Sequence, residues 1–259
     1  MTRSYRNHGL SAAALSLAAT LAWSTASAQT TSDEGTEISI TPYMWLAGVK
    51  GDIGAVVGGP PVAVDADFGG IFDNLSGAFM GKIDARHDRF GVIGDVVYMK
   101  VSADKNRQVG NVAAIGGELE SEVMQGTLAA YWRAHASDGF SLDLVAGARY
   151  TRSELEADLS LNNRQVSGSA DRDWWDPVIG IRGIAQVSPR FSLVGYADYG
   201  GFGVSSDSLW QVNAAVNCRF TDHVSGSLGY RYYSMTFSED GFDYDAQIAG
   251  PTLGVTITF

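Results

Sequence analysis

Charged residues are scarce in this 259-residue chain, at 18% of the total, and there is a single cysteine, Cys218. A soluble domain of this size typically carries about a quarter charged residues. One cysteine excludes an intrachain disulfide, and the lack of a long apolar run beyond the N-terminal segment excludes a bundle of membrane-spanning helices. In contrast, the chain has 31 glycines, 11% aromatic residues and 45% apolar residues, a mixture that excludes disorder. We infer that something other than water covers much of the surface.

The N-terminal segment has the pattern of an export signal. Arg3 and Arg6 precede an apolar run over residues 10–23, which is too short to span a bilayer and is followed by Ala26-Ser27-Ala28. We predict a signal peptide over residues 1–28 and a disordered periplasmic leader over 29–36. Cleavage removes two of the 18 basic residues and none of the 29 acidic ones. The mature chain is therefore strongly acidic, and the basic surface that nucleic-acid binding requires is absent.

From Glu37 onward, apolar residues alternate with a period of two in segments of about ten residues, as is typical of transmembrane β-strands. Over residues 90–98 and 140–150, one face is wholly apolar or glycine. The prediction is an all-β domain over 37–259, a closed antiparallel up-and-down transmembrane β-barrel of about ten strands, with eight or twelve as alternatives. The strands are placed near 37–50, 77–88, 90–103, 118–135, 140–158, 175–187, 191–203, 207–220, 224–237 and 244–259.

Aromatic residues lie at the ends of these apolar faces. Phe140 and Tyr150 are ten residues apart, which spans roughly 25 Å for a strand tilted by ~40°, close to the height of the apolar band of an outer-membrane barrel. A soluble lipocalin-like barrel, with its apolar face inside, is the alternative, but aromatics confined to both ends of one face favour contact with lipid. The predicted membrane girdle is Phe90, Tyr98, Trp132, Phe140, Tyr150, Trp175, Phe191, Tyr199, Trp210, Phe220 and Phe259.

The predicted connections alternate in length. Short ones at 87–89, 136–139, 188–190 and 221–223 are expected on the periplasmic side, together with both termini. Long ones at 51–76, 104–117, 159–174 and 238–243 are expected outside the cell, and the short link at 204–206 is an exception to the alternation.

The last residues, Thr252 to Phe259, resemble the C-terminal signal of outer-membrane proteins, in which a glycine precedes apolar or aromatic residues at the third-last and last positions. That resemblance implies recognition by the barrel-assembly machinery through Phe259. Other stretches resemble a family of small, largely uncharacterised proteobacterial outer-membrane β-barrel proteins, and these are residues 41–45, 176–180, 200–203, 206–207, 210–211, 229–231 and 250–251. The resemblance implies a fold and a location but no catalytic residues.

The polar faces of the predicted strands carry charges that we expect to point into the lumen. They are Lys82, Asp84, Arg86, Asp95, Arg133, Asp143, Arg149, Asp176, Arg182, Asp198, Arg219 and Arg231. Because charges in a narrow interior are costly unless they are paired or hydrated, we predict that they form a salt-bridged plug. A hydrated path through the same charges, weakly favouring anions, is the alternative.

Histidine is the obvious candidate for hydrolytic or metal chemistry, but His87, His135 and His223 all lie near predicted periplasmic turns, away from the outer rim. We therefore predict no enzyme activity, no cofactor and no metal site. The predicted function is that of a monomeric structural or porin-like barrel, for small solutes or ions, in the outer membrane of a Gram-negative bacterium. It would contact lipid and lipopolysaccharide. A surface-binding protein that uses its long loops, above all residues 51–76, is the alternative.

Overall fold

The computed structural model describes residues 35–53, 62–109, 113–161, 164–239 and 242–259. The predicted signal peptide and most of the predicted leader lie outside these residues. The first strand begins at Thr36, one residue inside the predicted leader. In the described ranges, the one helix, α1 (Phe68–Asp73), is too short to cross a membrane.

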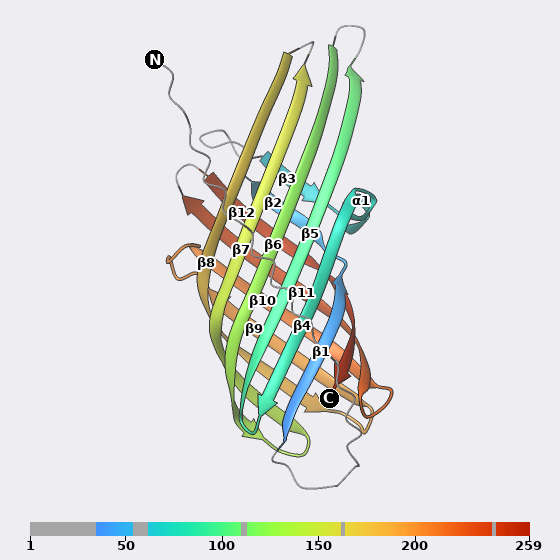
Figure 1. Ribbon diagram of the computed structural model, residues 1–259, viewed down its shortest axis with the longest axis vertical. Helices are drawn as coiled ribbons and strands as arrows, with labels where there is room; N and C mark the ends of the chain where they lie inside the picture. The colour runs from blue at the N-terminus through green and yellow to red at the C-terminus, as the bar shows by residue number, and fades with distance from the viewer. Residues whose placement is uncertain (1–34, 54–61, 110–112, 162–163, 240–241) are drawn as a thin grey trace, which may run out of the picture. The chain divides into compact units, whose positions relative to one another are not determined.

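Ten antiparallel strands close the barrel, as predicted. Consecutive strands pair with one another, and the first pairs with the last, which closes the barrel (Figure 1). The strands are β1 (Thr36–Trp45), β4 (Leu75–His87), β5 (Phe90–Val109), β6 (Ala113–Ala136), β7 (Phe140–Leu161), β8 (Arg164–Gln186), β9 (Phe191–Gly200), β10 (Ser208–Arg219), β11 (Val224–Glu239) and β12 (Phe242–Thr258).

Two further strands, β2 (Gly48–Ile53) and β3 (Val62–Ala66), lie within the predicted long connection at 51–76 or at its start. β2 continues β1 along β12 without a change of register, since Trp45 is opposite Thr252 and Gly48 is opposite Ala249. β3 then pairs with β2, and α1 leads the chain into β4. This connection is therefore structured on both sides of residues 54–61.

Three other connections are much shorter than predicted. Most of 104–117, 159–174 and 238–243 is strand, and only residues 110–112, 162–163 and 240–241 fall between strands. Here the ladder pairs polar residues or glycine, for example Asp104 with Glu118 and Asn106 with Gly116 across β5 and β6. Backbone pairing needs no apolar alternation, so the strands continue where the period-two signal has stopped.

The four predicted short connections are confirmed, and they lie at the same end of the barrel as the C-terminus (Figure 1). We call this end the short-turn end and the opposite one the long-strand end. His87, His135 and His223 all lie at the short-turn end, as expected.

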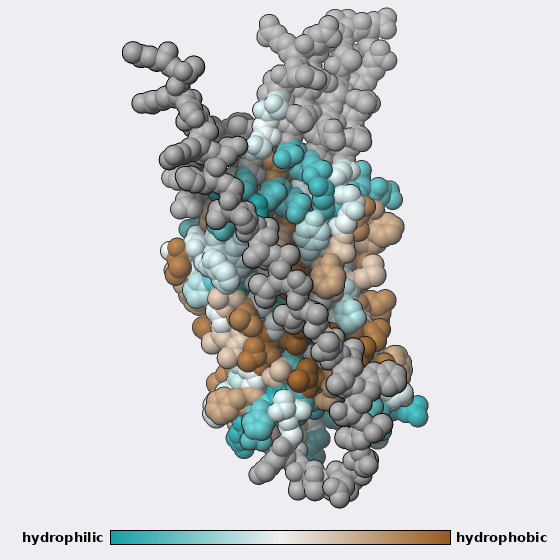
Figure 2. Space-filling model, viewed as in Figure 1, coloured by the Kyte–Doolittle hydropathy of each residue, from teal (hydrophilic) through white to brown (hydrophobic). Residues whose placement is uncertain are grey.

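The outward-facing side chains form an apolar belt around the barrel. On β7, for example, Leu144 is 45% exposed between Phe140 and Tyr150. On the face shown in Figure 2, hydrophobic residues gather between hydrophilic ones toward the two ends. All the predicted girdle aromatics are exposed except Tyr98 and Tyr150, which are half-buried, Tyr150 against Trp175.

Candidate functional site

The lumen contains a fully buried ion pair between Arg149 on β7 and Asp198 on β9. The Nη2 atom of Arg149 lies 2.7 Å from Oδ2 of Asp198, and the two side chains are 0% and 1% exposed. Arg149 Nε donates to Thr127 Oγ1 at 3.0 Å, and Gln211 Nε2 donates to Asp198 Oδ2 at 2.5 Å. Two charges can be removed from water in this way only because each is neutralised and hydrogen-bonded by its neighbours.

A second network joins four strands toward the short-turn end. Arg182 on β8 is paired with Asp84 on β4 and, at 2.8 Å, with Asp143 on β7. Arg133 on β6 reaches the other oxygen of Asp143, also at 2.8 Å. The hydroxyl of Tyr131 donates to Asp84, and its ring lies 4.3 Å from the Arg182 guanidinium carbon, a cation–π contact.

A third network ties β11 to β1 and β5. Arg231 Nη1 lies 3.3 Å from Asp95 Oδ2, and its Nε donates to Gln211 Oε1 at 2.9 Å. The hydroxyl of Tyr43 donates to Asp95 and accepts from Arg231. The guanidinium carbon lies 4.7 Å from the ring centre of Trp45. Gln211 joins this network to the central pair, because its amide also donates to Asp198.

The structure thus brings together eight of the twelve residues predicted to line the lumen: Asp84, Asp95, Arg133, Asp143, Arg149, Arg182, Asp198 and Arg231. Lys82 lines a small central cavity with Asp95 and Arg182. This cavity, of about 70 Å³, has room for a few water molecules.

Arg86 and Arg219 do not join the networks. Arg86 pairs with Glu37 at 3.3 Å, and Arg219 donates to the carbonyl of Pro189. Both lie at strand ends by the short turns, where alternation still points a side chain inward but the lumen is open to solvent. Among the described residues they are therefore not part of the three networks.

Asp176 is buried, as predicted, but it fixes a loop and pairs with no arginine among the ion pairs of the described residues. Its two oxygens accept from Ser206 N at 2.8 Å and from Ser206 Oγ at 2.6 Å. The loop can fold back this far because Gly201 and Gly203 take positive φ angles of 86° and 70°. Residues 176–180 and 200–207 include stretches that resemble the family of small outer-membrane barrels. The bonds between Asp176 and Ser206 bring these two segments into contact.

An apolar layer lies inside the barrel toward the long-strand end, and sequence reasoning missed it. Leu209, Met235 and Phe237 are 0–2% exposed, and the Trp174 and Phe237 rings stack with centroids 4.4 Å apart. Their strand neighbours face outward and include further aromatics such as Trp175. Along β11, however, Met235 and Phe237 alternate with Ser234, Thr236 and Ser238, so here the apolar residues take the inward face and polar residues no longer identify it.

Within the described part of the chain, no group of three or more His, Cys, Asp or Glu residues is arranged to hold a metal ion. The carboxylates of the lumen are engaged by arginine, tyrosine, glutamine or serine. The arrangement can hold strands in register.

Comparison with known proteins supports the fold. No sequence family and no curated protein matches the chain. The outer-membrane protease OmpT from Escherichia coli has a similar structure, with a TM-score of 0.56 at 13% identity, over 89% of this chain and 99% of that one. The translocator domain of the autotransporter NalP from Neisseria meningitidis gives 0.44 at 11% identity, over 88% and 90%. Ail from Yersinia pestis, solved with a heparin analogue, gives 0.36 at 14% identity, over 88% and 100%.

The similarity to OmpT shows that this chain has the fold of an outer-membrane β-barrel. At 13% identity it shows nothing about activity. The predicted resemblance to a family of small outer-membrane barrels agrees with the fold, and membership of that family stays a prediction.

Proposed function

We propose that the chain is a monomeric barrel of the Gram-negative outer membrane whose lumen is closed, so that it acts as a structural element and not as an open pore. The observation that carries this proposal is the Arg149–Asp198 pair, which is 0% and 1% exposed inside the barrel. A water-filled pore would leave such charges hydrated. The belt of outward apolar residues supports contact with lipid, with the short-turn end and both barrel termini in the periplasm.

Two predicted partners belong to the same proposal. Lipid would contact the belt, and lipopolysaccharide would contact the belt and the long-strand end. The barrel-assembly machinery would recognise the last strand and Phe259, which follows it directly and is 70% exposed. We propose no catalytic role, because the histidines of the described residues lie at the short-turn end, far from the outer rim.

A narrow anion channel is the second candidate. The observation that favours it is the central cavity, which Lys82, Arg182 and Arg231 line on the cationic side. If the ion-pair networks opened, these cationic side chains would stabilise an anion in the cavity. The closed barrel is preferred because the apolar layer lies above the cavity.

Planar-bilayer conductance separates the two candidates. We expect the wild-type protein to pass no steady current, and the double variant Arg182→Gln/Arg231→Gln to leak, because it loses the cations that hold Asp84, Asp143 and Asp95 in place. Arg152→Gln, at an exposed pair with Asp171, is the control and should stay silent. Heat-modifiable gel migration would show that each variant is folded.

Discrete openings of the wild-type protein, with an ion selectivity that shifts in the double variant, would contradict the closed lumen and establish the narrow channel.

A further inference from the structure

The wall of the barrel is interrupted between β1 and β4. These strands pair from Thr36 opposite His87 up to Pro42 opposite Gly81, and in the described residues no ladder joins them beyond that point. Proline has no N–H with which to continue the ladder. The backbone N–H of Trp45 donates instead to the sulfur of Met80, at 3.2 Å.

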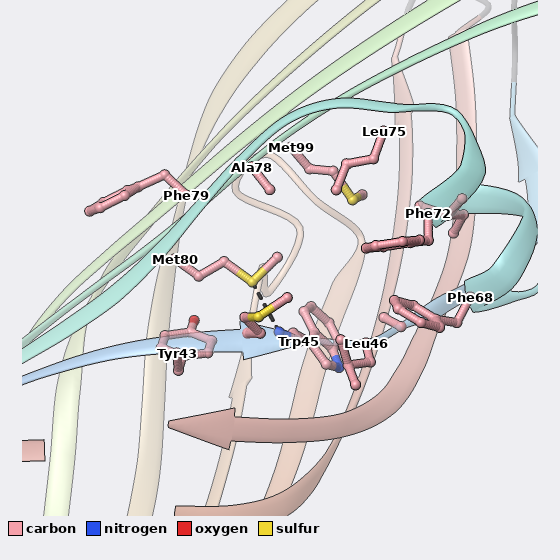
Figure 3. A pocket seen from close by; sticks show the side chains of 13 residues that line it. Tyr43, Trp45, Leu46, Phe68, Phe72, Leu75, Ala78, Phe79, Met80 and Met99 are labelled. Atoms are coloured by element: carbon pink, nitrogen blue, oxygen red, sulfur yellow. Dashed lines mark hydrogen bonds between the residues drawn. The ribbon is translucent and has the colours of Figure 1, made fainter. Parts of the chain in front are cut away.

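A pocket of about 210 Å³ occupies this interruption, between β1, β4 and α1 (Figure 3). Its lining comes from both sides of the wall. Trp45 and Met80 belong to the inward faces of their strands, whereas Met44 and Phe79 belong to the outward faces and are 53% and 64% exposed. For comparison, an apolar cavity of about 150 Å³ accommodates benzene. The pocket therefore has room for several carbon atoms and is lined by residues from both faces of the wall.

One buried polar atom in the lining lacks a partner. Trp45 is 8% exposed, and its Nε1 atom has no hydrogen-bond partner among the described residues. In Figure 3 this nitrogen lies at the edge of the indole near Leu46. Leaving a buried N–H unpaired is costly, so the pocket provides one hydrogen-bond donor in otherwise apolar surroundings.

The mouth of the pocket lies at the edge of the apolar belt nearer the long-strand end. Phe79 is opposite Tyr98, the aromatic residue that ends the apolar face of β5. If the barrel lies in the outer membrane as proposed above, the mouth faces the ester region of the outer leaflet. The ligand that reaches it by lateral diffusion is a lipid, and a lipid brings an apolar chain next to an ester oxygen.

We propose that this pocket binds one acyl chain of an outer-leaflet lipid through the wall, with the first methylenes against Met80 and Ile71 and the ester carbonyl accepting from Trp45 Nε1. The inference rests on the proposed membrane location. It adds a lateral binding site to a barrel whose axial path is closed.

Photo-cross-linking tests the proposal. The protein would be reconstituted into phosphatidylcholine vesicles that contain a phosphatidylcholine with a diazirine near the acyl carbonyl, and adducts would be located by mass spectrometry. We expect adducts at the inward-facing Met80 and Ala78 as well as at outward belt residues such as Ile83. Adducts at Ile83 alone would overturn the pocket but leave the membrane location intact. The absence of adducts at both would overturn the location itself.

Three variants sharpen the test. Ala78→Trp places an indole in the pocket and should abolish the Met80 adduct while leaving the Ile83 adduct unchanged. Ala214→Trp makes the same change on the outward face of β10 and should preserve both adducts. Trp45→Phe keeps a ring but removes the donor, and should reduce the Met80 adduct about fivefold. Persistence of the Met80 adduct in folded Ala78→Trp, or an unchanged yield in Trp45→Phe, would contradict the proposed binding mode.

Discussion

Asp198→Ala should lower the free energy of unfolding by about 3–5 kcal/mol, because it leaves Arg149 buried without its counter-charge. Arg149 is 0% exposed, so water does not replace the lost carboxylate in the folded barrel. The substitution also removes the acceptor of Gln211. Reversible urea unfolding from lipid vesicles measures the change.

Two further variants test whether the burial of Arg149 causes the loss of stability. Asp171→Ala removes one partner of an exposed arginine, Arg152, which also pairs with Glu154, and should have no measurable effect. The double variant Arg149→Met/Asp198→Leu replaces both charges with apolar side chains and should recover most of the loss. A cost for Asp198→Ala as small as that for Asp171→Ala would mean that water reaches the pair.

Leu144→Arg should lower the free energy of unfolding by about 2–4 kcal/mol, the cost of a charge near the bilayer midplane on the lipid-facing side of a barrel. Leu144 lies near the middle of the apolar belt, between Phe140 and Tyr150 on β7, and is 45% exposed to the surroundings of the barrel. The same vesicle-based unfolding measures the change.

Leu144→Met is the matched control, because it exchanges one apolar side chain for another of similar volume, and it should be nearly neutral. If arginine were tolerated as well as methionine at this position, the outward face would be in contact with water and the barrel would be a soluble one.

The features that sequence predicted best are those imposed by the alternation of a strand between two different environments. Residues 140–150 place leucine and alanine on one side and Asp143 and Arg149 on the other, so strand, face and inward charge all follow from one pattern. Five buried or partly buried ion pairs in the lumen involve residues predicted in this way.

The features that sequence missed are those that do not depend on such alternation. The outer half of β5 is polar on both faces over residues 104–108, so nothing in its pattern separates strand from loop. The apolar layer around Leu209 was missed for another reason: on β11 the apolar Met235 and Phe237 face inward, whereas the pattern used elsewhere assigns apolar residues to the outer face. Asp176 was placed correctly in the interior, but its partner Ser206 is in a loop, which period-two reasoning does not cover.

The interruption of the barrel wall beside Pro42 also could not be predicted from the sequence. Proline at this position is compatible with any unpaired strand edge, and only the three-dimensional path of β2, β3 and α1 shows that β4 is not paired there. The lateral pocket is therefore a finding of the structure alone.

Nitroxide accessibility at two consecutive residues of β10 tests most directly whether this is a lipid-embedded barrel with a closed lumen. Spin labels at Val212, which is 43% exposed on the outer face, and at Asn213, which lines the central cavity, would be examined in vesicles after Cys218→Ser removes the native thiol. The label at Val212 should be accessible to oxygen but not to a water-soluble nickel chelate, and the label at Asn213 should be accessible to neither. Access of the nickel chelate to Asn213 would contradict the closed lumen, and access to Val212 would contradict the membrane barrel.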